Sequence, residues 1–133
     1  MSAREFTLQL NKEILETDEK IDIAVRKIGI DALKNVVKKS PVDTGRFRGN
    51  WQTTIGTPTS LTVQSVDKSG TATINSGVRK VTKFDYKKNK VIFIQNNLPY
   101  ANRLENGWSR QAPKGMVSQT IQLLNARYKE ILI

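Results

Sequence analysis

The chain has 133 residues, with 22 Lys and Arg against 12 Asp and Glu, so that its net charge at pH 7 is +10. It contains neither Cys nor His, which excludes disulfide frameworks, thiolate or imidazole metal sites, and catalysis through a Cys nucleophile or a His base. The length suits one domain with a substantial core. The few acids of the C-terminal two-thirds are scattered along the sequence, and we expect no enzyme, no cofactor and no metal site.

The first segment, MSAREFTLQLNKE, contains no apolar stretch of the kind found in secretion signals. No window reaches the roughly 18 consecutive apolar residues that span a bilayer. We therefore expect synthesis in the cytosol and no membrane partner. Residues 1–16 are expected to form an N-terminal arm or an extension of the next helix, and residues 17–133 a single α+β domain.

An amphipathic helix is predicted from about Thr17 to Lys39 by an apolar stripe with spacings of 4, 3, 4 and 4 residues. The dipeptide Ser40-Pro41 ends it, because proline cannot donate a helical hydrogen bond and restricts the residue before it. The stripe consists of Ile21, Val25, Ile28, Ala32 and Val36.

The middle of the chain reads as a β-region. Alternating apolar and polar residues predict short half-buried strands at 51–55, 61–63 and 72–74, with a turn at 67–70. Residues 77–84 fit either a short helix with Ser76 as its N-cap or part of a loop. The run VIFIQNN at 91–97 is nearly continuous in β-branched and aromatic residues, which predicts the central strand of the sheet.

The C-terminal part alternates short elements with a long one. The segment YANRLENG predicts a short helix closed by Gly107, and residues 108–115 predict an irregular loop. A last helix is expected from about Met116 to Ile133. The predicted fold is therefore α+β, with a long N-terminal helix, a central mostly antiparallel sheet, a short helix and a long C-terminal helix.

The positive charge is concentrated after the first helix. Residues 1–39 carry eight basic and seven acidic side chains, whereas residues 40–133 carry fourteen and five. Phe84 and Tyr86 lie within the densest run, 79–90, which fits either a groove that binds phosphates and stacks bases or an exposed connection with both aromatics packed beneath it. The candidate contacts to DNA or to an acidic partner are Lys80, Lys83, Lys87, Lys88 and Lys90.

Two segments contain more turn-forming residues than a generic fold requires. In SPVDTGRFRGNW, residues 40–51, we expect Asp43 to form an Asx-type turn and Gly45 to adopt a positive φ, after which Arg46, Arg48 and Trp51 enter the sheet. In NNLPYANRLENGWSRQAPKGMV, residues 96–117, an isolated Glu105 is the natural partner of Arg46 or Arg48, within one subunit or across an interface. Loop architecture and helix capping alone would also account for both segments.

In this order, the two segments resemble the neck or tail-completion family of long-tailed double-stranded DNA bacteriophages, which is related to the minor tail protein Z of phage lambda. The matching residues of the first motif are Pro41, Asp43, Thr44, Gly45, Asn50 and Trp51. Those of the second are Asn97, Pro99, Tyr100, Ala101, Glu105, Gly107, Gln111, Pro113, Gly115 and Met116. The run 79–90 matches no motif of the family and receives no role from it.

The resemblance implies a structural protein of the virion neck or tail, assembled in the host cytoplasm. It implies a homo-oligomeric ring, with six subunits expected, between the head-connector proteins and the tail-tube or terminator proteins. Such a ring completes the tail or neck so that head and tail can join, and genome DNA passes through its lumen. The alternatives are a tail terminator ring that caps the tail tube and a small basic DNA-binding protein.

A subunit interface is expected near the sheet and the turn at 43–48, because a closed ring needs two different faces on each subunit. With Glu105 available to pair across it, Glu105→Gln is expected to weaken assembly more than folding.

Overall fold

The long helix α2 (Asp18–Lys39) organises the fold of this computed structural model, which describes residues 8–133. Its N-terminus is capped by Thr17, whose hydroxyl accepts a hydrogen bond of 3.2 Å from the Lys20 N–H. Acidic residues in the first turn and lysines in the last turn complement the helix dipole. The helix ends at Lys39, and the backbone becomes extended at Ser40. The predicted helix at 17–39 is confirmed.

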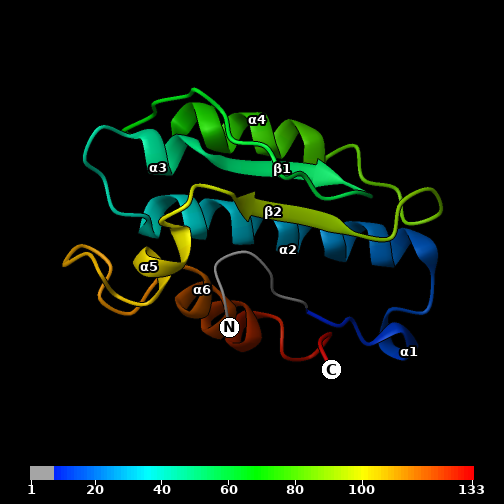
Figure 1. Cartoon of the computed structure of the whole chain (residues 1–133). Coiled ribbons are helices and arrows are strands. Elements are labelled where there is room, and N and C mark those ends of the chain that lie inside the picture. Colours follow the sequence, from blue (N-terminus) through cyan, green and yellow to red (C-terminus); the bar gives the residue numbers. More distant parts are fainter. Residues whose placement is uncertain (1–7) are drawn as a thin grey trace.

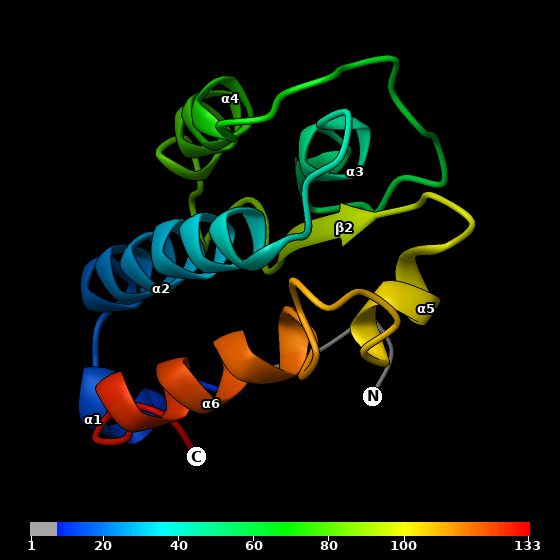
Figure 2. The same ribbon diagram turned by 90° about the vertical axis from the view of Figure 1, so that its left-hand side faces the viewer.

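Two further helices pack against opposite sides of α2, and the sheet lies beside it (Figures 1 and 2). These helices are α4 (Thr71–Val81), which also covers β1, and α6 (Val117–Arg127). The sheet consists of β1 (Trp51–Ile55) and β2 (Ile92–Asn96). With the short helices α1 (Lys12–Leu15), α3 (Arg46–Gly49) and α5 (Ala101–Glu105), this arrangement confirms the predicted α+β class with a C-terminal helix.

The largest core cluster lies where α2, the start of β1 and the beginning of α6 meet. Leu33, Val36 and Val37 of α2 are fully buried, as are Met116 and Val117 at the start of α6. The cluster consists of Leu33, Val36, Val37, Phe47, Trp51, Ile74, Leu98, Ala101, Ala112, Met116 and Val117. Both turn-rich segments of the sequence contribute to this list, so both are anchored in the core.

The sheet is smaller than the sequence suggested. β1 and β2 pair antiparallel from Trp51 opposite Asn96 to Ile55 opposite Ile92. Within residues 8–133, β2 has β1 as its single strand neighbour, so the prediction that 91–97 forms a central strand is wrong. One edge of β2 therefore has no strand of this described range beside it.

Residues 61–63 and 72–74 were predicted as strands, and both predictions are wrong. Residues 71–81 form α4 because Gly70, with a φ of +81°, turns the chain and the carboxylate of Asp67 caps the first turn. It accepts hydrogen bonds from the Thr73 N–H at 2.8 Å and the Thr73 hydroxyl at 2.7 Å. Ser76, the predicted N-cap of a helix at 77–84, lies inside α4.

The two ends of the described chain lie side by side. The N–H of Asn11 donates to the Ile131 carbonyl at 2.7 Å, and the N–H of Ile133 donates to the Gln9 carbonyl at 2.9 Å. The last helix therefore ends at Arg127 and not near Ile133, because the final residues turn back to pair with the N-terminal segment. Residues 12–15 form the separate helix α1, whereas residues 1–7 lie outside the described part, so the predicted division at residue 16 stays a prediction.

Over residues 8–133, no helix has both the length and the apolar character needed to cross a bilayer.

Candidate assembly surface

The structure brings the two turn-rich segments together at one end of the molecule. The side-chain amide of Gln111 pairs with the backbone of Val42 in both directions, accepting from its N–H at 2.8 Å and donating to its carbonyl at 3.0 Å. The rings of Phe47 and Tyr100 lie 5.9 Å apart. The segments enclose a surface hollow of about 420 Å³, lined by residues 41–47 and by Tyr100, Leu104, Trp108, Ser109 and Gln111.

The first turn is built differently from the prediction. Gly45 adopts the expected positive φ, +93°. The position also requires glycine because a Cβ there would lie 2.7 Å from the Lys68 backbone nitrogen. The turn hydrogen bond, however, runs from the Arg46 N–H to the Thr44 hydroxyl at 3.2 Å. No residue of the described range 8–133 donates a hydrogen bond to Asp43, which is exposed at the rim of the hollow, so the predicted Asx-type turn is wrong.

Arg46 and Arg48 lie on α3. The prediction that they enter the sheet is wrong. Arg48 serves the fold, because its guanidinium donates to the carbonyls of Lys68 at 2.7 Å, Ser40 at 2.8 Å and Lys38 at 3.2 Å. Arg46 is exposed and lines the hollow. The structure thus separates a structural arginine from one that is available to a partner.

Asn50 and Trp51 fix the junction between α3 and β1. The Trp51 indole N–H donates to the Ser40 hydroxyl at 2.7 Å. Trp51 begins β1 and so enters the sheet as predicted. The Asn50 amide donates to the Arg46 carbonyl at 2.8 Å and accepts from the Val63 N–H at 2.9 Å. Asn50 is completely buried, and its role is structural.

Glu105 caps α6 and has no arginine partner within residues 8–133. Its Oε1 accepts from the N–H groups of Met116 at 3.0 Å and Val117 at 2.8 Å, and its Oε2 accepts from the Ser118 N–H at 3.0 Å. A carboxylate at a helix N-terminus satisfies free N–H groups and interacts favourably with the helix dipole. The predicted pairing with Arg46 or Arg48 inside the subunit is therefore wrong, and Glu105 is only 8% exposed.

The remaining residues of the second motif include some that shape the loop and some that are exposed. Gly107 and Gly115 adopt positive φ values of +87° and +81° that shape the loop, and Gly107 closes α5 as predicted. Asn97 donates to the carbonyls of Thr59 and Leu61, both at 2.9 Å. Pro99 and Pro113 are exposed.

Sequence reasoning missed the most exposed aromatic residue of this surface. Trp108 is 71% exposed and Tyr100 is 37% exposed, and the Arg103 guanidinium lies 4.9 Å from the centre of the Trp108 ring. A large aromatic side chain in a polar, Pro- and Gly-containing loop was the available signal. Trp, Tyr and Arg are the residues that contribute most often to binding energy at protein interfaces.

The basic run 79–90 begins in α4 and continues into the turn before β2. Its candidate contacts are exposed: Lys80, Lys83, Lys87, Lys88 and Lys90. Phe84 is completely buried and cannot stack on a base. Tyr86 lies between Lys12 and Lys90, whose ammonium groups are 5.2 Å and 3.8 Å from its ring centre. Hydrogen bonding and charge from Lys12, with charge from Lys90, lower the pKa of Tyr86.

The run is therefore an exposed connection with Phe84 packed beneath it. Of the two aromatic residues predicted to stack on bases, Phe84 is not accessible. No cluster of three or more acidic, His or Cys side chains that could hold a metal ion occurs within residues 8–133.

The comparison with protein families identifies the chain. The sequence model described as "Bacteriophage HK97-gp10, putative tail-component" matches residues 4–107, which include the whole first motif and the second as far as Gly107. The chain belongs to the HK97 gp10-like family. The description of this family makes the chain a component of a bacteriophage tail. None of the curated proteins and none of the solved structures matches the chain.

Membership of the HK97 gp10-like family agrees with the resemblance found in the two motifs. The matched range stops before Trp108 and before the loop that carries Gln111, Pro113 and Gly115. The exposed aromatic at the hollow therefore lies in the part of the chain beyond that range.

Proposed function

We propose that this tail component forms a homo-oligomeric ring of six subunits at the head–tail junction. The ring completes the tail or neck in the host cytoplasm, joins the head-connector proteins to the tail-tube or terminator proteins, and lets genome DNA pass through its lumen. The observation that supports this function is the surface on which both motifs meet. There, buried motif residues hold an exposed set of Asp43, Arg46, Tyr100 and Trp108 around one hollow.

The motifs contain both residues that hold the loops in place and residues that are exposed, and an assembly contact requires both kinds. Glu105, Asn50 and Arg48 satisfy backbone groups and fix the loops, whereas Arg46 and Trp108 have exposed side chains and can be covered by a neighbour. A rigid aromatic anchor loses little conformational entropy on binding, and a nearby arginine can add a charged hydrogen bond. The hollow is thus the contact for an adjoining component of the neck.

The exposed lysines of the run 79–90 suit the same location. In a ring around a DNA channel, or against an acidic surface of a neighbouring ring, they would raise the association rate and fix the register. With Phe84 buried, an independent DNA-binding protein that stacks bases has less support than a ring that meets DNA through charge alone.

Electron microscopy of particles that lack this protein tests the proposal. Finished tails of normal length beside unjoined, DNA-filled heads are expected. Overlong tails would show that the protein terminates the tail tube instead, and normally joined virions would contradict both functions.

Complementation of the same particles tests the hollow. Trp108→Ala should leave tails and heads unjoined, because it removes the exposed aromatic anchor without opening a cavity in the core. Ile14→Ala is the matched control, since Ile14 is 52% exposed on α1 at the opposite end of the molecule from α5 (Figure 1). Equal joining by both variants would exclude the hollow from the contact.

A further inference from the structure

Within residues 8–133, the outer edge of β2 lacks a partner strand. The Gly56 N–H donates to the Val91 carbonyl at 2.9 Å, and residues of an antiparallel pair alternate in facing their partner. The backbone groups of Ile92 and Ile94 therefore point away from β1. No residue of the described part of the chain bonds to them. An open strand edge of this kind is a template for pairing with another chain.

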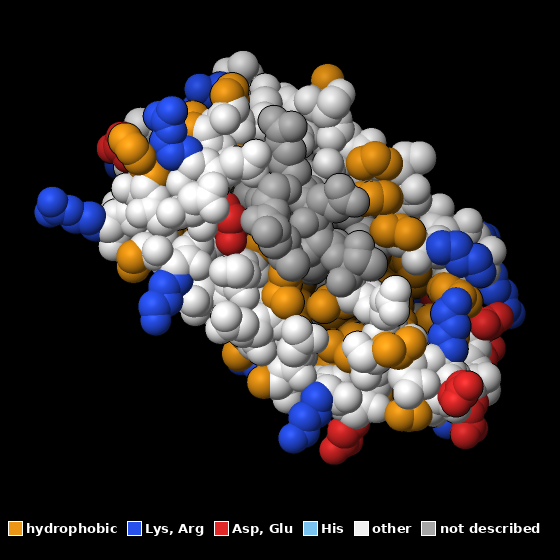
Figure 3. All heavy atoms as spheres, turned by 60° about the horizontal axis from the view of Figure 1, so that its bottom comes forward, with side chains coloured by type: hydrophobic (Ala, Val, Ile, Leu, Met, Phe, Trp, Pro, Cys, Tyr) orange, Lys and Arg blue, Asp and Glu red, His pale blue; other side chains and the backbone are white. Residues whose placement is uncertain are grey.

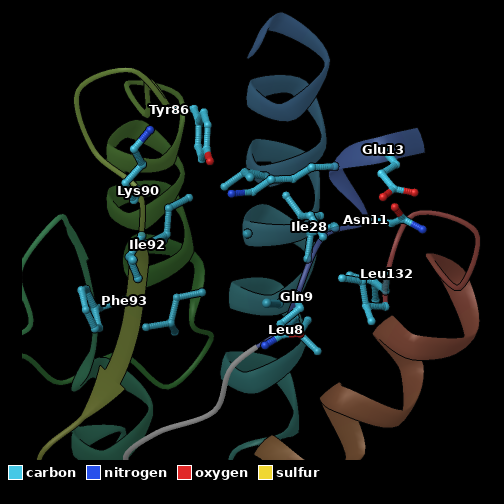
Figure 4. A pocket seen from close by; sticks show the side chains of 18 of the residues that line it. Leu8, Gln9, Asn11, Glu13, Ile28, Tyr86, Lys90, Ile92, Phe93 and Leu132 are labelled. Carbon is cyan, nitrogen blue, oxygen red and sulfur yellow. The ribbon is translucent and has the colours of Figure 1, made fainter. Parts of the chain in front are cut away.

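That edge borders an apolar groove of about 960 Å³. Apolar side chains gather in a hollow on the face shown in Figure 3. Figure 4 shows Ile92 of β2, Ile28 of α2, and Leu8 with Leu132 around one open space. The floor is formed by α2, and the far wall by residues 8–13 with the end of the chain. The groove has the position that a third strand beside β2 would occupy.

A second segment, residues 59–64, also has a row of backbone groups to which no residue of the described range bonds. Residues 59, 61 and 63 are tied to the sheet through side-chain amides and not through a backbone ladder. Gln95 exchanges two hydrogen bonds with the backbone of Thr59 at 2.9 and 3.1 Å. Gln52 donates to the Leu61 carbonyl at 2.6 Å, and Asn50 accepts from the Val63 N–H at 2.9 Å.

Bonding at every second residue is the pattern of an extended chain with one satisfied edge. The backbone groups of Ser60, Thr62 and Gln64 form the other edge, and nothing in residues 8–133 bonds to them. Leu61 in this segment is 69% exposed, and Val66 shortly after it is 66% exposed. The segment thus has the backbone pattern of a strand but no partner strand. This explains why its sequence predicts a strand that the isolated chain does not form.

Charge favours contact between these two surfaces. Each copy carries a net charge of +10, so two copies repel each other least where charged side chains are few. Residues 49–66 and residues 91–102 contain no Asp, Glu, Lys or Arg. The open edge of β2 and the segment 59–64 lie in these two uncharged stretches.

We propose that the segment 59–64 of one copy pairs with the open edge of β2 in the next copy and extends its sheet to three strands. The contact joins two different surfaces, so it is head-to-tail and can close into a ring. Leu61 gains an apolar surface in the groove, and the free backbone groups of Ser60, Thr62 and Gln64 gain partners. This inference rests on the proposed ring and names its subunit contact.

Cysteine cross-linking tests the contact directly, because the wild-type chain has no Cys and gives no background. Two single variants, Thr62→Cys and Val91→Cys, are purified, mixed and oxidised. Both positions are exposed. We expect a disulfide-linked dimer on a non-reducing gel from this mixture but from neither variant alone, whereas a mixture of Ile23→Cys with Val91→Cys should give none. Absence of the Thr62–Val91 product from protein that forms a ring would overturn the contact.

Assembly of matched variants gives a second measurement, by sedimentation velocity over a concentration series. Leu61→Lys should raise the concentration for half-assembly by about tenfold or more, because it places a charge in an apolar groove. Ile23→Lys, at a position 64% exposed on α2, should have no effect. Thr62→Pro removes one N–H of the free edge and should weaken assembly, whereas Thr62→Ala should not.

The outcomes separate this contact from the proposed function. A ring that survives both Leu61→Lys and Thr62→Pro overturns the pairing and leaves the neck function intact. Loss of the ring on deletion of residues 1–7, with no effect of either variant, would assign the groove to the N-terminal segment and also overturn the pairing. Normally joined virions without the protein would overturn the function, whatever the cross-linking shows.

Discussion

At the scale of single residues, two acids of this chain serve as helix caps. Glu105 holds the first N–H groups of α6, and Asp67 holds those of α4. Neither role is visible in a motif search, because a carboxylate in a turn-rich segment reads equally well as a partner for an arginine. The free acid of the first motif is Asp43, which is exposed at the hollow.

Glu105→Gln tests the capping role. The amide keeps one acceptor but turns a donor toward an N–H group and loses the charge, so we expect the free energy of unfolding to fall by about 1–2 kcal/mol. Thermal unfolding measures the loss, with the exposed Glu130→Gln as control. Unchanged thermal stability together with a lost oligomer would restore Glu105 as an interface residue.

Asp67 makes the stability depend on pH. Burial alone would raise the pKa of Asp67, but hydrogen bonds from Thr73, Gly70 and Ser69 outweigh burial and lower it. A carboxylate whose pKa is lower in the folded chain stabilises the fold above its unfolded pKa of about 3.9, and this contribution is lost as the pH falls through the folded pKa.

We therefore expect the urea midpoint of the wild type to exceed that of Asp67→Asn at pH above about 5, with the difference shrinking toward about pH 2. Asp43→Asn, which removes an exposed carboxylate that accepts no hydrogen bond from residues 8–133, is the control. A difference between wild type and Asp67→Asn that stays constant with pH would contradict the capping of α4 by a charged Asp67.

At the scale of elements, predictability follows local signals. Helix α2 could be predicted because a long periodic stripe, an N-cap and a proline stop agree with one another. Helix α4 could not, because Thr, Ile and Val give 71–81 the composition of a strand. Its helical state depends on the Asp67 cap and on the close packing of Gly77, and neither appears as a periodic pattern.

Gly77→Ala tests the packing of α4. A Cβ at Gly77 would collide with the Leu33 side chain and would lie 2.7 Å from the Thr53 hydroxyl. We expect a loss of about 1–3 kcal/mol in unfolding free energy by urea titration, although alanine is the better helix former. Asn75→Ala, exposed on the same helix, should be neutral or stabilising. A stabilised Gly77→Ala variant would contradict the close approach of α4 to α2.

At the scale of the whole molecule, the family could be recognised from the sequence, but the spatial arrangement of the two motifs could not. Each motif could be recognised alone, yet the pairing of Val42 with Gln111, 69 residues apart, exists only in the fold. The groove beside β2 combines the N-terminal segment, α2, β2 and the chain end, and no local pattern predicts such a combination. The net charge of +10 is unevenly distributed, because residues 49–66 and 91–102 contain no charged side chain.

The most direct test of the ring at the head–tail junction is a cryo-electron microscopy reconstruction of that junction in the intact virion. The account predicts a closed ring of this chain between the head connector and the tail tube, with segment 59–64 of each subunit beside β2 of the next and Trp108 against an adjoining component. A density map that places the chain elsewhere in the virion, or at the junction without a closed ring, would contradict the account.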